Sequence, residues 1–230
     1  MCPCGSLSCT SCSTRTGSPM MSAATSSTWR GSRGSAGRAP RGAAPCRSGS
    51  REETAAVIRV YQPMLLHGLV QTERYARAVI ATNSSLSPAD VERLVQARMA
   101  RQERLTGEDP PTVHLVVEEH VLRARVGGTE VMREQLEHLA DLVDQGVAEL
   151  RVLPTSLGAH PGLGAPLFLM LTPEGGRRPD MIYVETLTDG VFVDEPDRVA
   201  RYDTTMSELL ALALSPSESL SLLGTVVAEL

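Results

Sequence analysis

The composition of the chain changes abruptly at Glu52, and this change limits which residues can fold together. Residues 1–51 are dominated by Ser, Gly, Arg, Ala, Thr, Pro and Cys and hold almost no aliphatic side chains. Such a segment cannot bury enough apolar surface to offset the conformational entropy lost on folding. Residues 52–230 carry regular apolar patterns and are long enough for one ordinary domain. We therefore expect a disordered basic tail, residues 1–51, followed by a single domain, residues 52–230.

The charge divides at the same position. The first 51 residues contain seven arginines and no acidic residue, whereas the rest of the chain contains 15 arginines and all 27 acidic residues, a net charge of −12. An acidic domain repels the phosphates of nucleic acids. For residues 52–230 we therefore expect a small partner protein or a small-molecule effector rather than DNA.

All five cysteines lie in the tail, so the domain has neither a disulfide nor a thiol nucleophile. No apolar run reaches the about 18 residues of a membrane span, and no signal peptide is recognisable, so we expect a cytoplasmic protein. Within the tail, Cys2, Cys4, Cys9 and Cys12 are candidate ligands of a zinc ion, and residues 30–51 are a candidate nucleic-acid arm. An out-of-frame translation explains the same composition more simply, and we favour it.

The order of the expected elements predicts the fold class. Short apolar runs predict strands at 56–61, 112–117, 149–153, 165–171, 181–187 and 191–194. Capping residues at Thr72, Ser87, Thr129 and Ser215, and a proline at Pro196, predict the starts of helices. Asp189-Gly190 predicts a tight hairpin turn. The whole predicts an α+β domain with one mixed sheet of about five strands and helices packed on it.

Catalytic signatures are missing from the sequence. It has no nucleophile elbow, zinc-protease, P-loop or dinucleotide-binding pattern, so we expect neither an enzyme nor a cofactor or metal. The alternative is an enzyme-like small-molecule site that uses Glu118 and Glu119 at a strand end and His160 in a loop. That alternative requires the three side chains to converge within ~3 Å of a common point, and we expect them to be scattered. Gly127-Gly128 is either an anion site at a helix start or a simple turn.

Several segments resemble a known family. Residues 52–80 read EETAAVIRVYQPMLLHGLVQTERYARAVI, and further matching segments are Ala97–Gln102, Val117–Arg123, Gly127–Leu139, Val152–His160, Tyr183–Glu185 and Ala213–Ser219. Together they resemble the uncharacterised C-terminal domain of actinobacterial Xre-type helix-turn-helix regulators, the WhiJ-like or Scr-type antitoxin-like proteins. His67 stands where that family has a proline, and Glu118 where it has an aspartate.

The resemblance implies a regulatory domain that senses an effector or binds a small partner protein encoded nearby. DNA binding in such regulators belongs to an N-terminal helix-turn-helix, and residues 1–51 show no such pattern. We therefore expect no specific DNA binding by this chain, and the oligomeric state stays open. The candidate ligand- or partner-binding residues are Arg98, Arg101, Gln102, Glu118, Glu119, His160, Tyr183 and Glu185.

Overall fold

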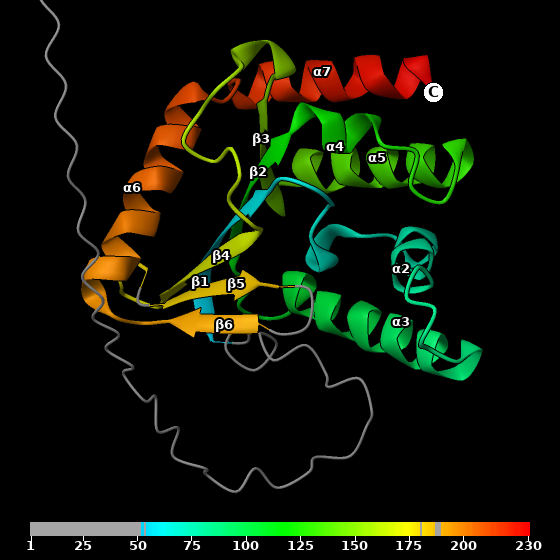
Figure 1. Cartoon of the computed structure of the whole chain (residues 1–230), viewed down its shortest axis with the longest axis horizontal. Coiled ribbons are helices and arrows are strands. Elements are labelled where there is room, and N and C mark those ends of the chain that lie inside the picture. The colour runs from blue at the N-terminus through cyan, green and yellow to red at the C-terminus, as the bar shows by residue number, and fades with distance from the viewer. Residues whose placement is uncertain (1–51, 53, 180, 187–189) are drawn as a thin grey trace, which may run out of the picture. The chain divides into compact units, whose positions relative to one another are not determined.

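A six-stranded mixed sheet organises the part of the chain that the computed structural model describes, residues 52, 54–179, 181–186 and 190–230. Its strands are β1 (Ala55–Gln62), β2 (Thr112–Glu118), β3 (Ala148–Leu153), β4 (Phe168–Pro173), β5 (Met181–Glu185) and β6 (Gly190–Val193), in the spatial order β3-β2-β1-β4-β5-β6. β1, β2 and β3 are parallel, whereas β4, β5 and β6 add to β1 as an antiparallel meander. The predicted α+β class with a mixed sheet is confirmed (Figure 1). All six predicted strand ranges overlap strands of this sheet, for which we expected about five strands in total.

Helices cover the two faces of this sheet unequally. They are α2 (Glu73–Ile80), α3 (Pro88–Gln102), α4 (Glu119–Arg123), α5 (Thr129–Asp144), α6 (Pro196–Leu212) and α7 (Pro216–Glu229), with 3-10 turns η1 (Gly68–Val70), η2 (Glu103–Thr106) and η3 (Thr155–Leu157). Of these described helices, α6 lies alone on one side of the sheet and the other five lie on the opposite side (Figure 1). The expected tail and residues 188 and 189 of the expected hairpin turn lie outside the described residues.

Local capping chemistry fixes where several helices begin. Ser87 and Ser215 cap helices as predicted, and each forms a capping box, with Asp90 and Glu218 respectively. In each box the serine hydroxyl accepts a hydrogen bond from the backbone N–H three residues on. The Thr72 hydroxyl accepts from the N–H of Tyr75 at 3.2 Å, as its position predicts. These interactions satisfy N–H groups that lack a partner in the first turn of a helix.

The prediction that Thr129 caps a helix is wrong. Thr129 is the first residue of α5, and the cap is Gly128, whose φ of 94° disfavours any residue with a side chain. At the preceding Gly127, a Cβ atom would lie 2.9 Å from the Cβ of Ala78 in α2. The glycine pair therefore serves a left-handed turn and a close helix approach, which explains its presence without an anion.

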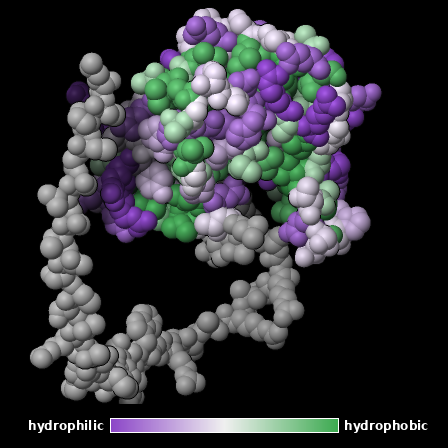
Figure 2. All heavy atoms as spheres, turned by 45° about the horizontal axis from the view of Figure 1, so that its top comes forward, coloured by the Kyte–Doolittle hydropathy of each residue, from purple (hydrophilic) through white to green (hydrophobic). Residues whose placement is uncertain are grey.

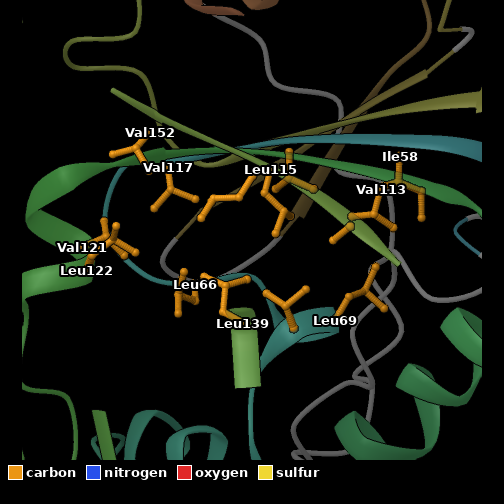
Figure 3. Close-up of a cluster of buried hydrophobic side chains, with 14 of the residues drawn as sticks. Ile58, Leu66, Leu69, Val113, Leu115, Val117, Val121, Leu122, Leu139 and Val152 are labelled. Atoms are coloured by element: carbon orange, nitrogen blue, oxygen red, sulfur yellow. The ribbon is translucent and has the colours of Figure 1, made fainter. Parts of the chain in front are cut away.

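The larger core lies between the sheet and four helices, α2, α4, α5 and α7. Alternate strand residues point into it, among them Ile58, Val113, Leu115, Val117 and Val152, and they face Leu66, Leu69 and Leu139 (Figure 3). The period-2 alternation of β1 and β2 and the helical spacing of α5 place these side chains on matching faces. The apolar alternation of the strands and the apolar spacing of the helices in the sequence thus produce this core.

The smaller core lies under α6. Tyr61, Phe168 and Met170 from the sheet pack against Met206 and Leu209 of the helix, and all five side chains are buried. The rings of Tyr61 and Phe168 have centroids 5.5 Å apart, within the range in which aromatic pairs attract. A single helix cannot cover the width of six strands, so this core protects only part of its face.

The described surface shows no strong membrane signal. Within the described residues no single helix is long and apolar enough to cross a membrane; α6 and α7 meet that test only as a pair bent by 70°, on length and composition alone. Hydrophobic and hydrophilic residues are interleaved over the face that Figure 2 shows. Large exposed apolar side chains, such as Met64 and Leu163, come from separate segments.

Truncation of Leu136 tests the larger core. Leu136 in α5 is fully buried, so we expect Leu136→Ala to lower the free energy of unfolding by about 2–5 kcal/mol through lost burial and a cavity. The matched control is Leu163→Ala, because Leu163 is 70% exposed, and we expect it to cost less than about 0.5 kcal/mol. Urea unfolding of both variants measures the difference, and equal costs would contradict the assigned core.

Candidate functional site

A charged groove lies on the face of the sheet that α6 covers only in part. Arg59, His114 and Glu149 are register partners on β1, β2 and β3, so their side chains form one row across this face. The three side chains remain between 25% and 36% exposed. A groove of about 490 Å³ lies over the row, and its lining is completed by Arg151, Arg177, Arg178, Asp203, Met206, Ser207 and Leu210. We call it the sheet groove.

Two of the four arginines in the sheet groove have acidic partners. Arg59 Nη1 lies 3.2 Å from Asp203 Oδ1 of α6, and Arg151 Nε lies 2.8 Å from Glu149 Oε1. Burial lowers the pKa of His114; the nearby Glu149 carboxylate opposes this effect, and the two guanidinium groups add to it. His114 is therefore neutral near pH 7, and each ion pair cancels its own charge.

The other two arginines come from the loop between β4 and β5. Arg177 and Arg178 are exposed, and neither forms an ion pair with any residue that the structure describes. Their guanidinium groups carry donors in a fixed planar arrangement that matches carboxylate and phosphate oxygens. The sheet groove is thus able to bind an anion. No cluster of three metal-ligating side chains occurs among the described residues.

Three of the predicted binding residues, Arg98, Arg101 and Gln102 of α3, point into the protein instead. Arg98 Nη1 donates to Gln71 Oε1 at 2.6 Å, and Gln102 Nε2 donates to the carbonyls of Gly68 and Gln71 at 2.7 and 2.8 Å. The Arg101 guanidinium lies 3.3 Å from the buried carboxylate of Glu52. These residues hold the segment around η1, so the structure gives them an internal role.

The connection between β1 and α2, residues 62–72, explains why such side chains are needed. Its residues 66–71 are buried although they lie outside the sheet and the long helices, so their backbone groups need partners from elsewhere in the protein. Buried Gln135 of α5 supplies two of them, because its amide donates to Val70 O and accepts from Thr72 N, both at 2.7 Å. The polar side chains of this region therefore satisfy backbone groups of the buried segment.

Of the three residues that we expected to be scattered, Glu118 and His160 lie in contact. His160 Nε2 lies 3.2 Å from Glu118 Oε1, and the hydroxyl of Tyr61 donates to the same oxygen at 2.8 Å. The Tyr61 hydroxyl also lies 3.1 Å from the carbonyl of Gly162. Burial, and secondly the Glu118 carboxylate, raise the pKa of Tyr61 well above its usual value. We call these three side chains the strand-end cluster.

The third predicted acid–base residue lies apart from this cluster. The Glu119 carboxylate accepts from the backbone N–H of Thr155 at 2.9 Å and from Arg123 Nε at 2.8 Å. The hydrogen bond from the Thr155 backbone, and to a lesser extent that from Arg123, holds the pKa of Glu119 below its usual value. The three side chains therefore do not converge on a common point. Glu119 begins α4 and faces the loop at η3.

The last two predicted residues belong to strand β5. Tyr183 is buried in the larger core, where its ring packs on Phe192 with centroids 5.0 Å apart. The same ring covers Gly190, where an added Cβ would overlap it. Glu185 is exposed at the end of the strand. Neither side chain reaches the sheet groove, so Tyr183 serves packing.

The sequence reasoning missed every residue of the sheet groove. These residues come from β1, β2, β3, the β4–β5 loop and α6, and only the register of the sheet brings them together. One signal was present: Arg59, His114, Glu149 and Arg151 are polar residues at alternate positions of strands that are otherwise apolar. Polar residues on one face of an interior strand indicate that this face is not fully covered.

The architecture defines the protein as an α+β domain with a helix-covered face and a partly open charged face. The model of the family described as a domain of unknown function (DUF5753) matches residues 47–225. The chain belongs to this family. No curated protein and no solved structure matches the sequence.

Buried His67 predicts a pH dependence of stability. Burial, followed by the charges of Arg101 and Arg98, lowers its pKa well below 6.5, while its Nδ1 accepts from the N–H of Leu69. Below pH 6.5 the His67 imidazole is protonated in the unfolded chain but stays neutral in the folded chain. Stability is therefore complete above that pH and falls by up to about 1.4 kcal/mol per unit as the pH drops towards the folded pKa.

The variant His67→Asn replaces the capping nitrogen Nδ1 with a side-chain oxygen that can also accept a hydrogen bond, and it removes this titration. We expect urea unfolding between pH 7.5 and 5.5 to show a shallower loss of stability for His67→Asn than for the wild type. His120→Asn, which replaces an exposed histidine of α4, should retain the wild-type slope. Identical slopes for all three proteins would disprove the role of His67.

The strand-end cluster predicts a second stability effect. Tyr61→Phe removes a buried donor from the Glu118 carboxylate, and we expect a loss of about 1–3 kcal/mol in the free energy of unfolding. The control is Tyr202→Phe in α6, because the Tyr202 ring packs on Phe168 but its hydroxyl bonds to no described residue. Thermal or urea unfolding compares the two, and an equal effect would refute the hydrogen bond.

Proposed function

We propose that residues 52–230 are a non-catalytic regulatory domain, of the kind that Xre-type helix-turn-helix regulators carry behind their DNA-binding head, and that the sheet groove is its effector site. The protein then acts in the cytoplasm and senses an effector for a transcriptional or antitoxin-like system. The observation that carries this proposal is the sheet groove itself, in which four arginines gather on an otherwise acidic domain.

The dimensions of the sheet groove favour a small molecule over a partner protein as its occupant. Its volume of about 490 Å³ lies in the range of small-molecule sites, roughly 300–1,000 Å³. A protein partner generally needs a larger area with a buried apolar centre. The large exposed apolar side chains of the described residues are scattered over several elements, which does not favour such an interface.

A second candidate function is an enzyme built on the strand-end cluster, and the contact between Glu118 and His160 favours it. However, the side chains of His160 and Glu118 are only 5% and 11% exposed, and Tyr61 is buried. A general acid or base must reach the proton that it transfers. The cluster better suits a clamp that fastens residues 155–165 to the ends of β1 and β2.

The proposal is tested by measuring binding and turnover together. The full chain is screened by thermal shift against neutral, cationic and anionic metabolites, and a compound that binds the folded state raises the melting temperature. We expect at least one such compound, recovered chemically unchanged by mass spectrometry. Conversion of the compound would instead support the enzyme, and a panel without any stabilising compound would count against an effector site.

A matched pair of variants locates the binding. Ser207→Trp fills the sheet groove from α6, and Ser221→Trp changes an equivalent residue of α7, since both serines are exposed and donate to the carbonyl four residues earlier. We expect Ser207→Trp to abolish the thermal shift and Ser221→Trp to preserve it. A shift that survives Ser207→Trp would place the effector elsewhere and refute the site.

A further inference from the structure

The charges that line the sheet groove define what it can hold. Four guanidinium groups face two carboxylates, those of Glu149 and Asp203. Each carboxylate is already paired with one arginine, and His114 is neutral near pH 7 because of its lowered pKa. The described lining therefore retains two positive charges, those of Arg177 and Arg178. Electroneutrality of a partly enclosed site favours a ligand group with two negative charges.

The wall beside these arginines has a different character. An adjoining pocket of about 430 Å³ shares Arg178, Asp203 and Ser207 with the sheet groove and adds Thr204 and Glu208 of α6. The Thr204 and Ser207 hydroxyls each donate to a carbonyl of their own helix, so their oxygens remain available only as acceptors. Glu208 is also an acceptor when ionised. This wall therefore suits ligand groups that donate hydrogen bonds.

We propose that the ligand of the sheet groove is a small hydroxylated dianion, with its phosphate or dicarboxylate charge held by Arg177 and Arg178 and its hydroxyl groups facing Thr204, Ser207 and Glu208. This inference rests on the proposed effector site and names its chemical class. Arginine is suited to both anionic groups, because its planar fork binds two oxygens at once. Asp203 connects the two regions, since it lines both and holds Arg59 in place.

Three probe compounds distinguish a phosphate ester, a dicarboxylate and an uncharged polyol as the ligand of the sheet groove. Calorimetric titrations of the full chain at constant ionic strength use glycerol 3-phosphate, malate and glycerol. We expect saturable binding of at least one dianion and none of glycerol, which has the hydroxyls without the charge. Tighter binding of glycerol 3-phosphate identifies a phosphate ester, and tighter binding of malate identifies a dicarboxylate. Absence of binding by both dianions overturns the proposal, as does binding of glycerol with equal affinity.

The decisive comparison uses two double variants with the same change in net charge. Arg177→Gln with Arg178→Gln should weaken binding of the dianion by about tenfold or more, since charge-assisted hydrogen bonds are lost. Arg125→Gln with Arg201→Gln changes exposed arginines that do not line the groove, and it should change the dissociation constant by less than about twofold. Equal weakening by both pairs would show attraction by net charge only and overturn the proposal.

The outcome also separates this inference from the function on which it rests. A neutral or cationic metabolite that stabilises the chain, and loses this effect in Ser207→Trp, would retain the effector site while the dianion probes fail. In that case only the ligand class is wrong. Since all four arginines of the two double variants are exposed, their melting temperatures without ligand should match the wild type, which verifies that they are folded.

Discussion

Two successive connections between parallel strands, from β1 to β2 and from β2 to β3, determine the rest of the architecture. The chain runs from β1 to β2 and from β2 to β3 in the same direction across the sheet. Crossovers between parallel strands are right-handed almost without exception, so both sets of intervening helices must lie on the same face. Helices α2, α3 and α5 do so. The antiparallel meander then adds strands on the other side of β1 without adding a helix, and α6 alone is left to cover the second face.

The covered and the open face use polar residues in different ways. On the helix-covered side, Gln102 and Gln135 satisfy backbone groups of the buried segment between β1 and α2, where an unpaired group would cost about as much as a lost hydrogen bond. Arg98 acts indirectly, because it donates to the side chain of Gln71. On the open side, the arginines of the sheet groove are paired only in part. Polar residues of a segment that resembles a known family can therefore belong to the scaffold, whereas the residues of the sheet groove are marked in the sequence only by polar positions within apolar strands.

This difference explains how much of the molecule the sequence could predict. Capping boxes at Ser87 and Ser215 are local interactions, and so are the apolar alternations of β1 and β2; these were predicted correctly and produced the right fold class. The start of α5 was placed one residue late because Gly128 caps it through backbone conformation, which a search for capping side chains overlooks. Residues of the sheet groove were missed because Arg59 and Glu149 become neighbours of His114 only through strand register, a long-range property.

Under the proposed function, the acidic character of the domain makes its basic groove selective for small anions over long polyanions. At physiological ionic strength, charges beyond about 8 Å are largely screened, so an anion in the groove would respond mainly to Arg177 and Arg178 and not to the net charge of −12 that residues 52–230 carry. A long polyanion such as DNA extends well past this distance and meets the surrounding carboxylates. A small dianion avoids them, because it fits within the groove. Under the proposed function, the same charges that would repel nucleic acid leave room for a compact anion, which is the discrimination that a sensor of a small effector requires.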